Sequence, residues 1–169
     1  MKSINLALLA ILISAFSHLM FVGSAAADGA HHSHAKKKVD YNDVEEHVFG
    51  RASDPDKAVV TIEVEMADTF RFEPSAVEVR RGDTVRFIVK NKGQMMHEMV
   101  LGTEQSLAEH AELMKKFPGM EHDEPHMAHI GPGKKSSMGW QFTQSGEFRF
   151  GCLIPGHFDA GMVGTIIVR

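Results

Sequence analysis

Three side chains that can bind a metal ion are evenly spaced near the end of the chain. Cys152, His157 and Met162 follow one another at intervals of five residues, and Pro155 and Gly156 lie between the first two. A single loop can therefore present a thiolate, an imidazole and a thioether to one ion. This mixed donor set suits copper that alternates between two oxidation states, with the thioether as a long, weak axial ligand. The spacing predicts a redox-active copper site.

Cys152 is the only cysteine in the 169 residues. Stabilising cysteines of exported proteins come in pairs, so a lone thiol is inert and buried, bridged to another chain, nucleophilic, or a metal ligand. Taken singly, a buried cysteine is usually a small apolar residue, and the same holds for a buried methionine. Their combination with His157 in one loop favours the metal. A nucleophilic thiol is disfavoured, because no acidic orienting partner stands at a recognisable spacing.

A second imidazole has to come from another segment, and His97 follows a turn at Asn91–Gly93, at the start of an expected strand. Further motifs accompany these ligand candidates, namely Phe72-x-Pro74, Val77-x-Val79 and Gly82-Asp83-x-Val85. With them, residues 58–169 resemble the cupredoxin family. The resemblance implies a Greek-key β-sandwich with a type 1 copper at one end. It also implies His97, Cys152 and His157 as equatorial ligands and Met162 as the axial ligand.

The chain is most similar to the periplasmic copper-tolerance cupredoxins of the CopI type, which pair a His-rich leader with a Met/His-rich insertion. It departs from the better-known electron carriers at two positions. Glu98 follows the first histidine, where many carriers have Asn, and Leu153 follows the cysteine, where many have Ser or Thr. The residues that are replaced make hydrogen bonds that orient the ligands and tune the potential. The ligands themselves are unaffected.

The elements expected to position these ligands are strands. Apolar and polar residues alternate in residues 60–66, 77–80 and 85–89, which is typical of half-buried strands, and residues 163–168 are expected to form a final strand. Thr103 as a cap and Pro118-Gly119 as a stop predict a helix near 103–117, followed by a loop over 119–135. We expect an all-β, antiparallel Greek-key sandwich of seven to eight strands with this one helical insertion.

The ends of the chain have different compositions. An apolar run over residues 4–22, before Ala25-x-Ala27, predicts a cleaved signal peptide at 1–27 and a periplasmic protein without stable membrane insertion; the alternative is an uncleaved anchor. Residues 28–57 are expected to be a flexible His-rich leader, and 58–169 the folded domain. A formal net charge of −4 without a basic stripe argues against nucleic acid as a partner.

Methionine and histidine are unusually frequent in an insertion at residues 95–129, next to the first copper ligand. Because thioethers and imidazoles favour Cu(I), this segment suggests accessory copper sites. The alternative is ordinary core and loop packing. The leader histidines form a weaker candidate, with a solvated linker as their alternative. The accessory candidates are Met95, Met96, Met99, Met120, His122, His126, Met127, His129, His31, His32 and His34.

Two functions fit these patterns. The first is a periplasmic copper-binding protein for copper tolerance, which binds Cu(I) and oxidises it if an electron acceptor is present. The second is a single-copper electron carrier that serves a redox partner protein. The many soft donors favour the first, because a carrier needs only one copper. Whether the protein is a Cu(I) oxidase or a binding protein without enzymatic activity stays open at this point.

Overall fold

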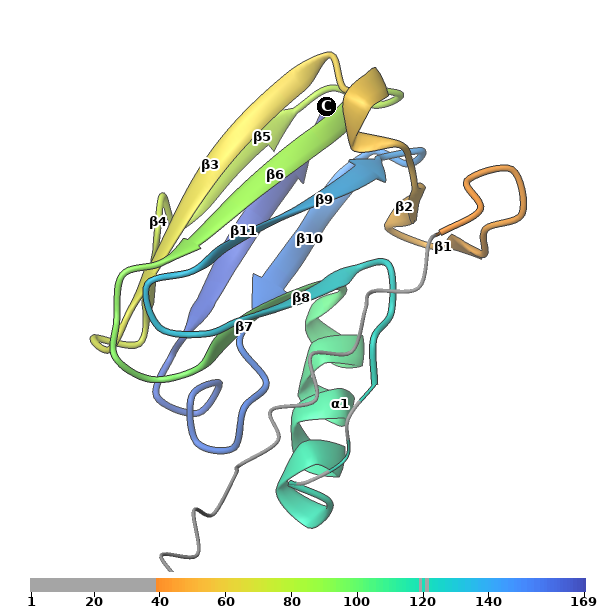
Figure 1. Cartoon of the computed structure of the whole chain (residues 1–169). Helices are drawn as coiled ribbons and strands as arrows, with labels where there is room; N and C mark the ends of the chain where they lie inside the picture. Colours follow the sequence, from red (N-terminus) through yellow and green to blue (C-terminus); the bar gives the residue numbers. More distant parts are fainter. Residues whose placement is uncertain (1–38, 119, 121) are drawn as a thin grey trace, which may run out of the picture. The chain divides into compact units, whose positions relative to one another are not determined.

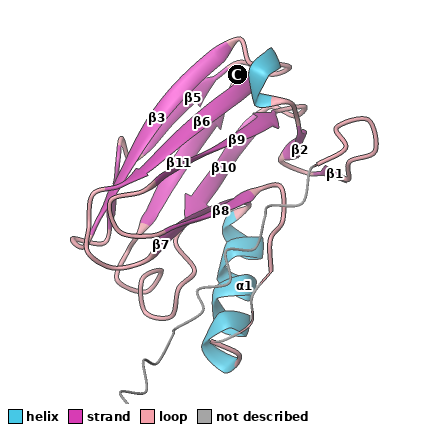
Figure 2. Cartoon of the chain, in the orientation of Figure 1, coloured by secondary structure: helices cyan, strands magenta, loops and turns pink. Residues whose placement is uncertain are grey.

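Alternating apolar residues build two sheets, which form a sandwich in the computed structural model (Figures 1 and 2). The structure describes residues 39–169 except 119 and 121. The signal peptide expected at 1–27 and the leader histidines His31, His32 and His34 lie outside the described residues. The predicted all-β sandwich is confirmed, and its core contains Val64, Phe87, Trp140 and Phe150, all at most 1% exposed.

The first sheet has six strands, in the order β1 (Glu46–His47), β2 (Gly50–Ala52), β9 (Lys135–Gln141), β6 (Thr84–Asn91), β3 (Val60–Ala67) and β4 (Arg71–Glu73). The second has five, in the order β5 (Ala76–Val79), β11 (Val163–Val168), β10 (Gly146–Gly151), β7 (His97–Gly102) and β8 (Met127–Ile130). A 3-10 turn, η1 (Pro55–Lys57), and one helix, α1 (Glu104–Lys116), complete the described elements.

The sheets are mixed, so the expectation of a purely antiparallel sandwich is wrong. β3 pairs with β6 in parallel, and β5 pairs with β11 in parallel. Parallel neighbours need a long connection between them. The chain supplies it between β3 and β6, because β4 and β5 intervene and β5 belongs to the other sheet.

The described residues contain eleven strands rather than seven to eight. The strands β1, β2 and β8 are short and lie outside the segments with a clear alternating pattern. β1 and β2 fall within the expected leader, where Phe49 stacks on Trp140 with ring centroids 5.1 Å apart and its carbonyl accepts the indole N–H at 2.8 Å. This packing holds residues 46–52 on the sheet edge, which corrects the prediction that the flexible leader extends to residue 57. The expected loop over 119–135 likewise contains β8.

Helix α1 confirms the predicted helical insertion. The Thr103 side chain accepts from the backbone N–H of Ser106 at 3.0 Å, and the Ser106 hydroxyl accepts from the backbone N–H of Thr103 at 2.9 Å. This reciprocal cap fixes the helix start. Leu107, Ala111 and Met114 are its buried face. Among the described residues, no helix is both long and apolar enough to cross a membrane.

His126 lies in an apolar environment beside β2 and β9. Its ring centroid is 5.8 Å from that of Phe49 and 6.1 Å from that of Trp140, and its Nδ1 has no hydrogen-bond partner among the described residues. Burial, with a smaller effect of the nearby His47, lowers the pKa of His126 from 6.5 to about 4. The folded chain therefore holds this imidazole neutral.

This histidine should make the metal-free protein less stable in acid. Because the folded-state pKa lies below the unfolded value of 6.5, the unfolded chain takes up the proton first as the pH falls. His126→Leu should reduce the loss of unfolding free energy between pH 6.5 and pH 4 by up to about 3 kcal/mol. Urea unfolding at both pH values measures this loss of unfolding free energy. An equal loss in wild type and variant would contradict a neutral, buried His126.

Candidate metal centre

Two neighbouring strands of the second sheet bring the three strongest ligand candidates together. His97 opens β7, Cys152 directly follows β10, and His157 lies in the loop between β10 and β11. Their ligand atoms all lie within 4.8 Å of one another. His97 and Cys152 are fully buried, and His157 is 9% exposed. The predicted trio is thus assembled where β7 begins and where the loop between β10 and β11 lies, and this loop is at the lower end of the sandwich in Figure 1.

Backbone hydrogen bonds close the loop between β10 and β11. The N–H of Cys152 donates to the carbonyl of Met162 at 3.1 Å, and the N–H of Met162 donates to the carbonyl of His157 at 3.0 Å. Met162 is fully buried within the core next to the loop. These bonds place the residue beside the other ligand candidates. Its role as the axial ligand stays a prediction.

The donor atoms fit a type 1 copper. The Nε2 of His97 lies 3.0 Å from the Asp68 carboxylate, while its buried Nδ1 has no hydrogen-bond partner among the described residues. The Sγ of Cys152 lies 3.2 Å from the Nδ1 of His157. Two imidazoles and one cysteine sulfur therefore converge, as a trigonal type 1 site requires. An unpartnered buried nitrogen is costly unless a ligand satisfies it.

The electrostatics of the trio keep the thiol and the imidazole of His157 neutral until a cation binds. Burial raises the pKa of the Cys152 thiol to about 12, and burial together with the neighbouring His97 lowers the pKa of His157. Without an ion, this environment keeps the thiol protonated. A metal ligand has to be deprotonated, so binding of a cation displaces the thiol proton and stabilises the thiolate.

Phe70 covers the His157 side of the site. Its backbone has a φ of 57°, a left-handed conformation that is rare for a bulky side chain. Its ring centroid lies 4.7 Å from that of His157 and 6.4 Å from that of His97. Strained backbone of this kind is found where the surrounding structure enforces it, often at functional sites. Here it places an apolar ring against both imidazoles.

Asp68 orients His97, a role that the sequence did not reveal. Its carboxylate also accepts from the backbone N–H groups of Gln94 at 2.7 Å and Met95 at 3.3 Å. These hydrogen bonds, with that of His97, lower the pKa of Asp68. A Cβ at residue 93 would collide with this carboxylate, so Gly93 permits its approach. The Gly93 in the turn before His97 was the only signal of this arrangement in the sequence.

Removing the Asp68 carboxylate should weaken copper binding without removing a ligand. Carboxylates that hold the far nitrogen of a ligand histidine contribute about 10–100-fold to metal affinity. We expect Asp68→Ala to lower the copper affinity by about this factor, measured by competition with a chelator. Asp83→Ala, which removes a carboxylate at the opposite end of the sandwich, is the control. Equal affinities of wild type and Asp68→Ala would show that Asp68 does not orient His97.

Glu98, in β7, holds the backbone that follows Cys152 through a hydrogen bond. It is 3% exposed, and its carboxylate accepts from the backbone N–H of Leu153 at 2.7 Å and from the Nε2 of His129 at 2.8 Å. Its own backbone N–H approaches the Sγ of Cys152 at 3.4 Å. The two positions that depart from the familiar carriers, Glu98 and Leu153, are thus joined to each other by a hydrogen bond.

The accessory candidates are dispersed by the fold. Met99 points into the sandwich core, and Met127 packs under helix α1. Met95, Met96 and Met120 are exposed. His126 lies beside Trp140, whereas His122 and His129 approach each other with ring centroids 6.5 Å apart. Met99 and Met127 have ordinary packing roles in this arrangement, and accessory copper binding by the remaining residues stays a prediction.

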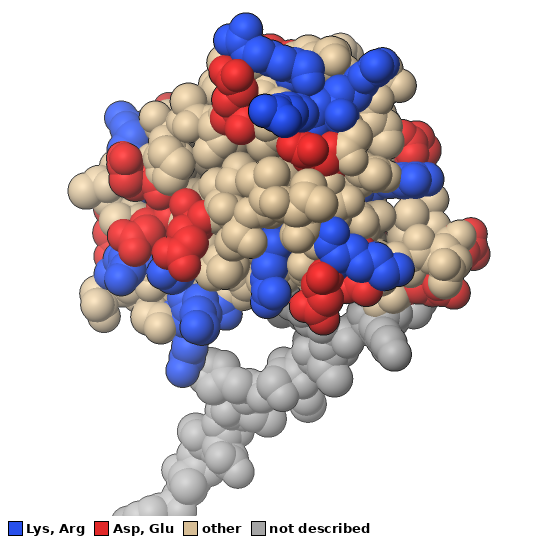
Figure 3. Space-filling model, turned by 90° about the horizontal axis from the view of Figure 1, so that it is seen from above, with Lys and Arg blue, Asp and Glu red and all other residues tan. Residues whose placement is uncertain are grey.

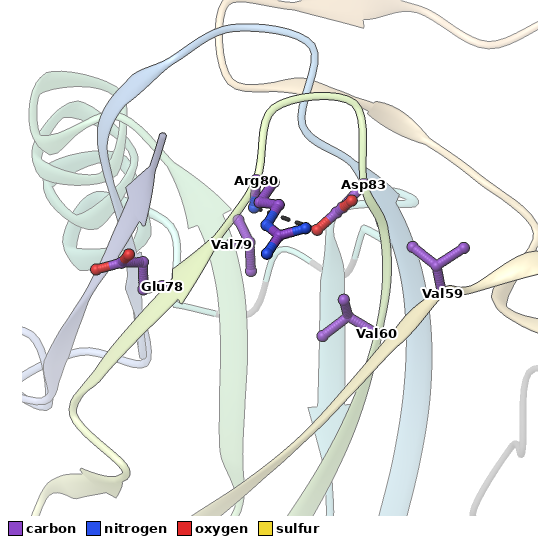
Figure 4. Close-up of a pocket in the computed structure, with 6 residues that line it drawn as sticks. All are labelled: Val59, Val60, Glu78, Val79, Arg80 and Asp83. Atoms are coloured by element: carbon purple, nitrogen blue, oxygen red, sulfur yellow. Dashed lines mark hydrogen bonds between the residues drawn. The ribbon is translucent and has the colours of Figure 1, made fainter.

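A pocket of about 490 Å³ lies at the opposite end of the sandwich, where β5 ends and β6 begins (Figure 4). It is lined by Val59, Val60, Glu78, Val79, Arg80 and Asp83. These side chains include no thiol, imidazole or thioether, so the pocket offers none of the soft donors of the metal centre. On the face shown in Figure 3, acidic and basic groups are interspersed, without one dominant charge.

Comparison with known proteins agrees with this centre. Residues 58–169 match the plastocyanin/azurin family of copper-binding proteins. The copper-resistant cuproprotein CopI of Rubrivivax gelatinosus is 45% identical over 151 residues, 89% of this chain and 91% of that protein. The CopI of Pseudomonas aeruginosa is 33% identical over 150 residues, 72% of this chain and 82% of that protein.

Solved structures support the fold. Auracyanin B has a TM-score of 0.61 at 21% identity, covering 71% of this chain and 96% of its own. The auracyanin of Roseiflexus castenholzii has a TM-score of 0.58 at 21% identity, covering 66% and 98%. The predicted family and copper cofactor are confirmed by these findings together with the His97, Cys152 and His157 cluster. The chain belongs to the plastocyanin/azurin family of copper-binding proteins and, within it, groups with the CopI cuproproteins.

Proposed function

We propose that this protein gives copper tolerance in the periplasm by binding copper at a type 1 centre formed by His97, Cys152 and His157, with Met162 as the axial ligand. The observation that carries the proposal is the convergence of the three ligand atoms within 4.8 Å, where the Nδ1 of His97 has no hydrogen-bond partner in the part of the chain that the structure describes. The similarity to proteins named copper-resistant cuproprotein supports the physiological role. The expected signal peptide supports the compartment.

The chain's own residues prepare this centre for a soft cation. Asp68 holds the far nitrogen of His97, and Glu98 holds the backbone that follows Cys152. Phe70 and the surrounding core exclude water from the sulfur. Copper bound by such a donor set exchanges one electron between Cu(I) and Cu(II).

A growth experiment tests the tolerance role. Cells that lack the gene should grow poorly in copper-supplemented medium, and the wild-type gene should restore growth. Their respiration in copper-free medium should equal that of wild-type cells. Normal growth of the deletion strain in copper, with impaired respiration, would overturn the proposal.

Electron transfer to a partner protein is the alternative, and one observation favours it. Of the four ligand candidates, His157 is the one with measurable exposure, at 9%, whereas His97, Cys152 and Met162 are fully buried. An electron could therefore leave through the edge of this imidazole. The growth experiment separates the two roles, because a dedicated carrier predicts a respiratory defect without copper sensitivity.

Oxidation of Cu(I) is the most specific part of the proposal. In that reaction an added Cu(I) ion loses one electron, and the oxidised type 1 centre gains it. We expect anaerobic Cu(I) to bleach the thiolate–copper absorption of the Cu(II)-loaded protein by one centre per added ion. Ag(I), which binds soft donors but gives no electron, is the control. Absorption that persists after Cu(I) addition would exclude the reaction.

A further inference from the structure

A second group of imidazoles lies outside the metal centre, where helix α1 faces β8 and the segment that joins the two. His110 comes from the helix, His122 from the segment that follows it, and His129 from β8. The Nε2 atoms of His110 and His122 are 2.8 Å apart, and their ring centroids are 4.8 Å apart. All three side chains are partly exposed, so an ion can reach them from solvent.

The separation of the first two rings is close to what a shared ion requires. With metal–nitrogen bonds of about 2.0–2.1 Å, two imidazoles on a tetrahedral ion have nitrogens about 3.3 Å apart and ring centroids about 5 Å apart. The Nδ1 of His122 is buried without a hydrogen-bond partner among the described residues. Only one of the two facing Nε2 atoms can donate a hydrogen to the other, so the arrangement has free acceptor capacity.

His129 is oriented in the same way as the copper-ligand candidate His97. The Glu98 carboxylate holds its Nε2 at 2.8 Å, as Asp68 holds the Nε2 of His97 at 3.0 Å. Its Nδ1 lies 3.5 Å from the carboxylate of Asp123, which directly follows His122 in the chain. A carboxylate on one ring nitrogen is the usual setting of a metal-binding histidine, and here the other nitrogen faces the Asp123 carboxylate that would bind the same ion.

We propose that His110 and His122 bind a second copper ion between them, and that His129, whose ring centroid is 6.5 Å from that of His122, completes the site together with Asp123 when its ring shifts toward the ion, with Glu98 as the positioning residue of His129. Three imidazoles and a carboxylate lack the sulfur donors that select Cu(I). This set suits a divalent ion, and Cu(II) binds nitrogen and oxygen donors more tightly than the other divalent metals of its row. The site therefore takes Cu(II), without the absorption that a thiolate ligand gives.

Glu98 connects this site with the type 1 centre. The same residue holds His129 with its carboxylate, accepts from the N–H of Leu153, and places its backbone N–H 3.4 Å from the Sγ of Cys152. The second site deepens the proposed copper-binding function. Its own existence rests on the histidine geometry and not on Cys152.

The test uses the full chain with two sets of ligand candidates removed. Cys152→Ala eliminates the thiolate, and alanines at His31, His32 and His34 eliminate the leader. Titration with Cu(II) should still give one bound ion, with an electron paramagnetic resonance spectrum that shows nitrogen coupling and without thiolate–copper absorption. Adding His110→Ala or His122→Ala should lower the affinity by at least about tenfold. His47→Ala, a histidine outside the cluster, should leave binding unchanged.

Several outcomes would overturn the site. They are the absence of Cu(II) binding in the background chain, equal binding after His110→Ala and His122→Ala, or binding of Zn(II) but not Cu(II). Two measurements on His110→Ala in the chain that retains Cys152 keep folding separate from binding. We expect its circular dichroism and its thiolate–copper absorption to match the wild type. If the wild-type protein itself shows no thiolate–copper absorption, that result refutes the type 1 centre instead.

Discussion

The Cys152→Ala protein is expected to lose the thiolate–copper absorption completely and to fail to restore growth in copper. Residues that merely orient a ligand contribute about 10–100-fold to metal affinity, so loss of the sulfur ligand itself should cost more, at least several hundred-fold at this centre. The side chain is fully buried, and the change removes one atom of a small apolar residue. We therefore expect the fold to persist, with a cost of about 1 kcal/mol.

The control for this variant is Ile154→Ala, in the same loop. Ile154 packs against the core but offers no donor atom, so its truncation disturbs the loop and leaves the ligands. The Ile154→Ala protein should keep the absorption and should restore growth in copper. Two results would contradict the account: a Cys152→Ala protein that retains tight copper binding with charge-transfer absorption, or full copper tolerance of cells that produce it.

Replacing Glu98 with alanine should destabilise the metal-free protein by about 1–3 kcal/mol, the cost of leaving a buried N–H without its acceptor. The change removes the acceptor of the buried Leu153 N–H and of the partly exposed His129 imidazole. Glu98→Gln should cost less, because an amide oxygen can still accept from the Leu153 N–H. Urea unfolding gives all three free energies. Glu63→Ala, which removes an exposed carboxylate, should change the stability little.

The cost of Glu98→Gln should also depend on pH. The hydrogen bond to Glu98 is the main reason that the pKa of His129 is raised above 6.5 in the folded protein. A raised pKa contributes stability that is fully present below 6.5 and is lost as the pH rises through the folded-state value. The difference between wild type and Glu98→Gln should therefore be largest near pH 6 and shrink at alkaline pH. A difference in unfolding free energy that does not change with pH would show that Glu98 and His129 do not form an ion pair.

Long alternating segments made most of the sandwich predictable. β3 and β6 each have an alternating run with one buried face, the mostly apolar β11 ends the domain, and Thr103 and Pro118 delimit the helix. The strands that were missed are short, and tertiary packing forms them. β1 and β2 have two and three residues. They are held by contacts of Phe49 with Trp140, which lies far along the chain, so no local pattern reveals them.

The ligand candidates were predictable because their chemical types recur at fixed intervals in one loop. The residues that orient them were not. Asp68 reaches His97 across 29 positions, and Glu98 reaches the N–H of Leu153 across 55. At the sequence level Glu98 was only a departure from a family pattern, and His110 lay within the predicted helix and was not among the accessory candidates. Their roles depend on which strands and loops lie side by side, which the fold alone decides.

The most direct test of the copper centre is the copper content of the purified protein measured together with its optical spectrum. As Cu(II) is added to the metal-free protein, we expect an intense thiolate–copper absorption that reaches its maximum at one ion per chain. Further Cu(II) should bind without increasing this absorption. Binding of copper with no thiolate absorption at any ratio would contradict a centre built from His97, Cys152 and His157.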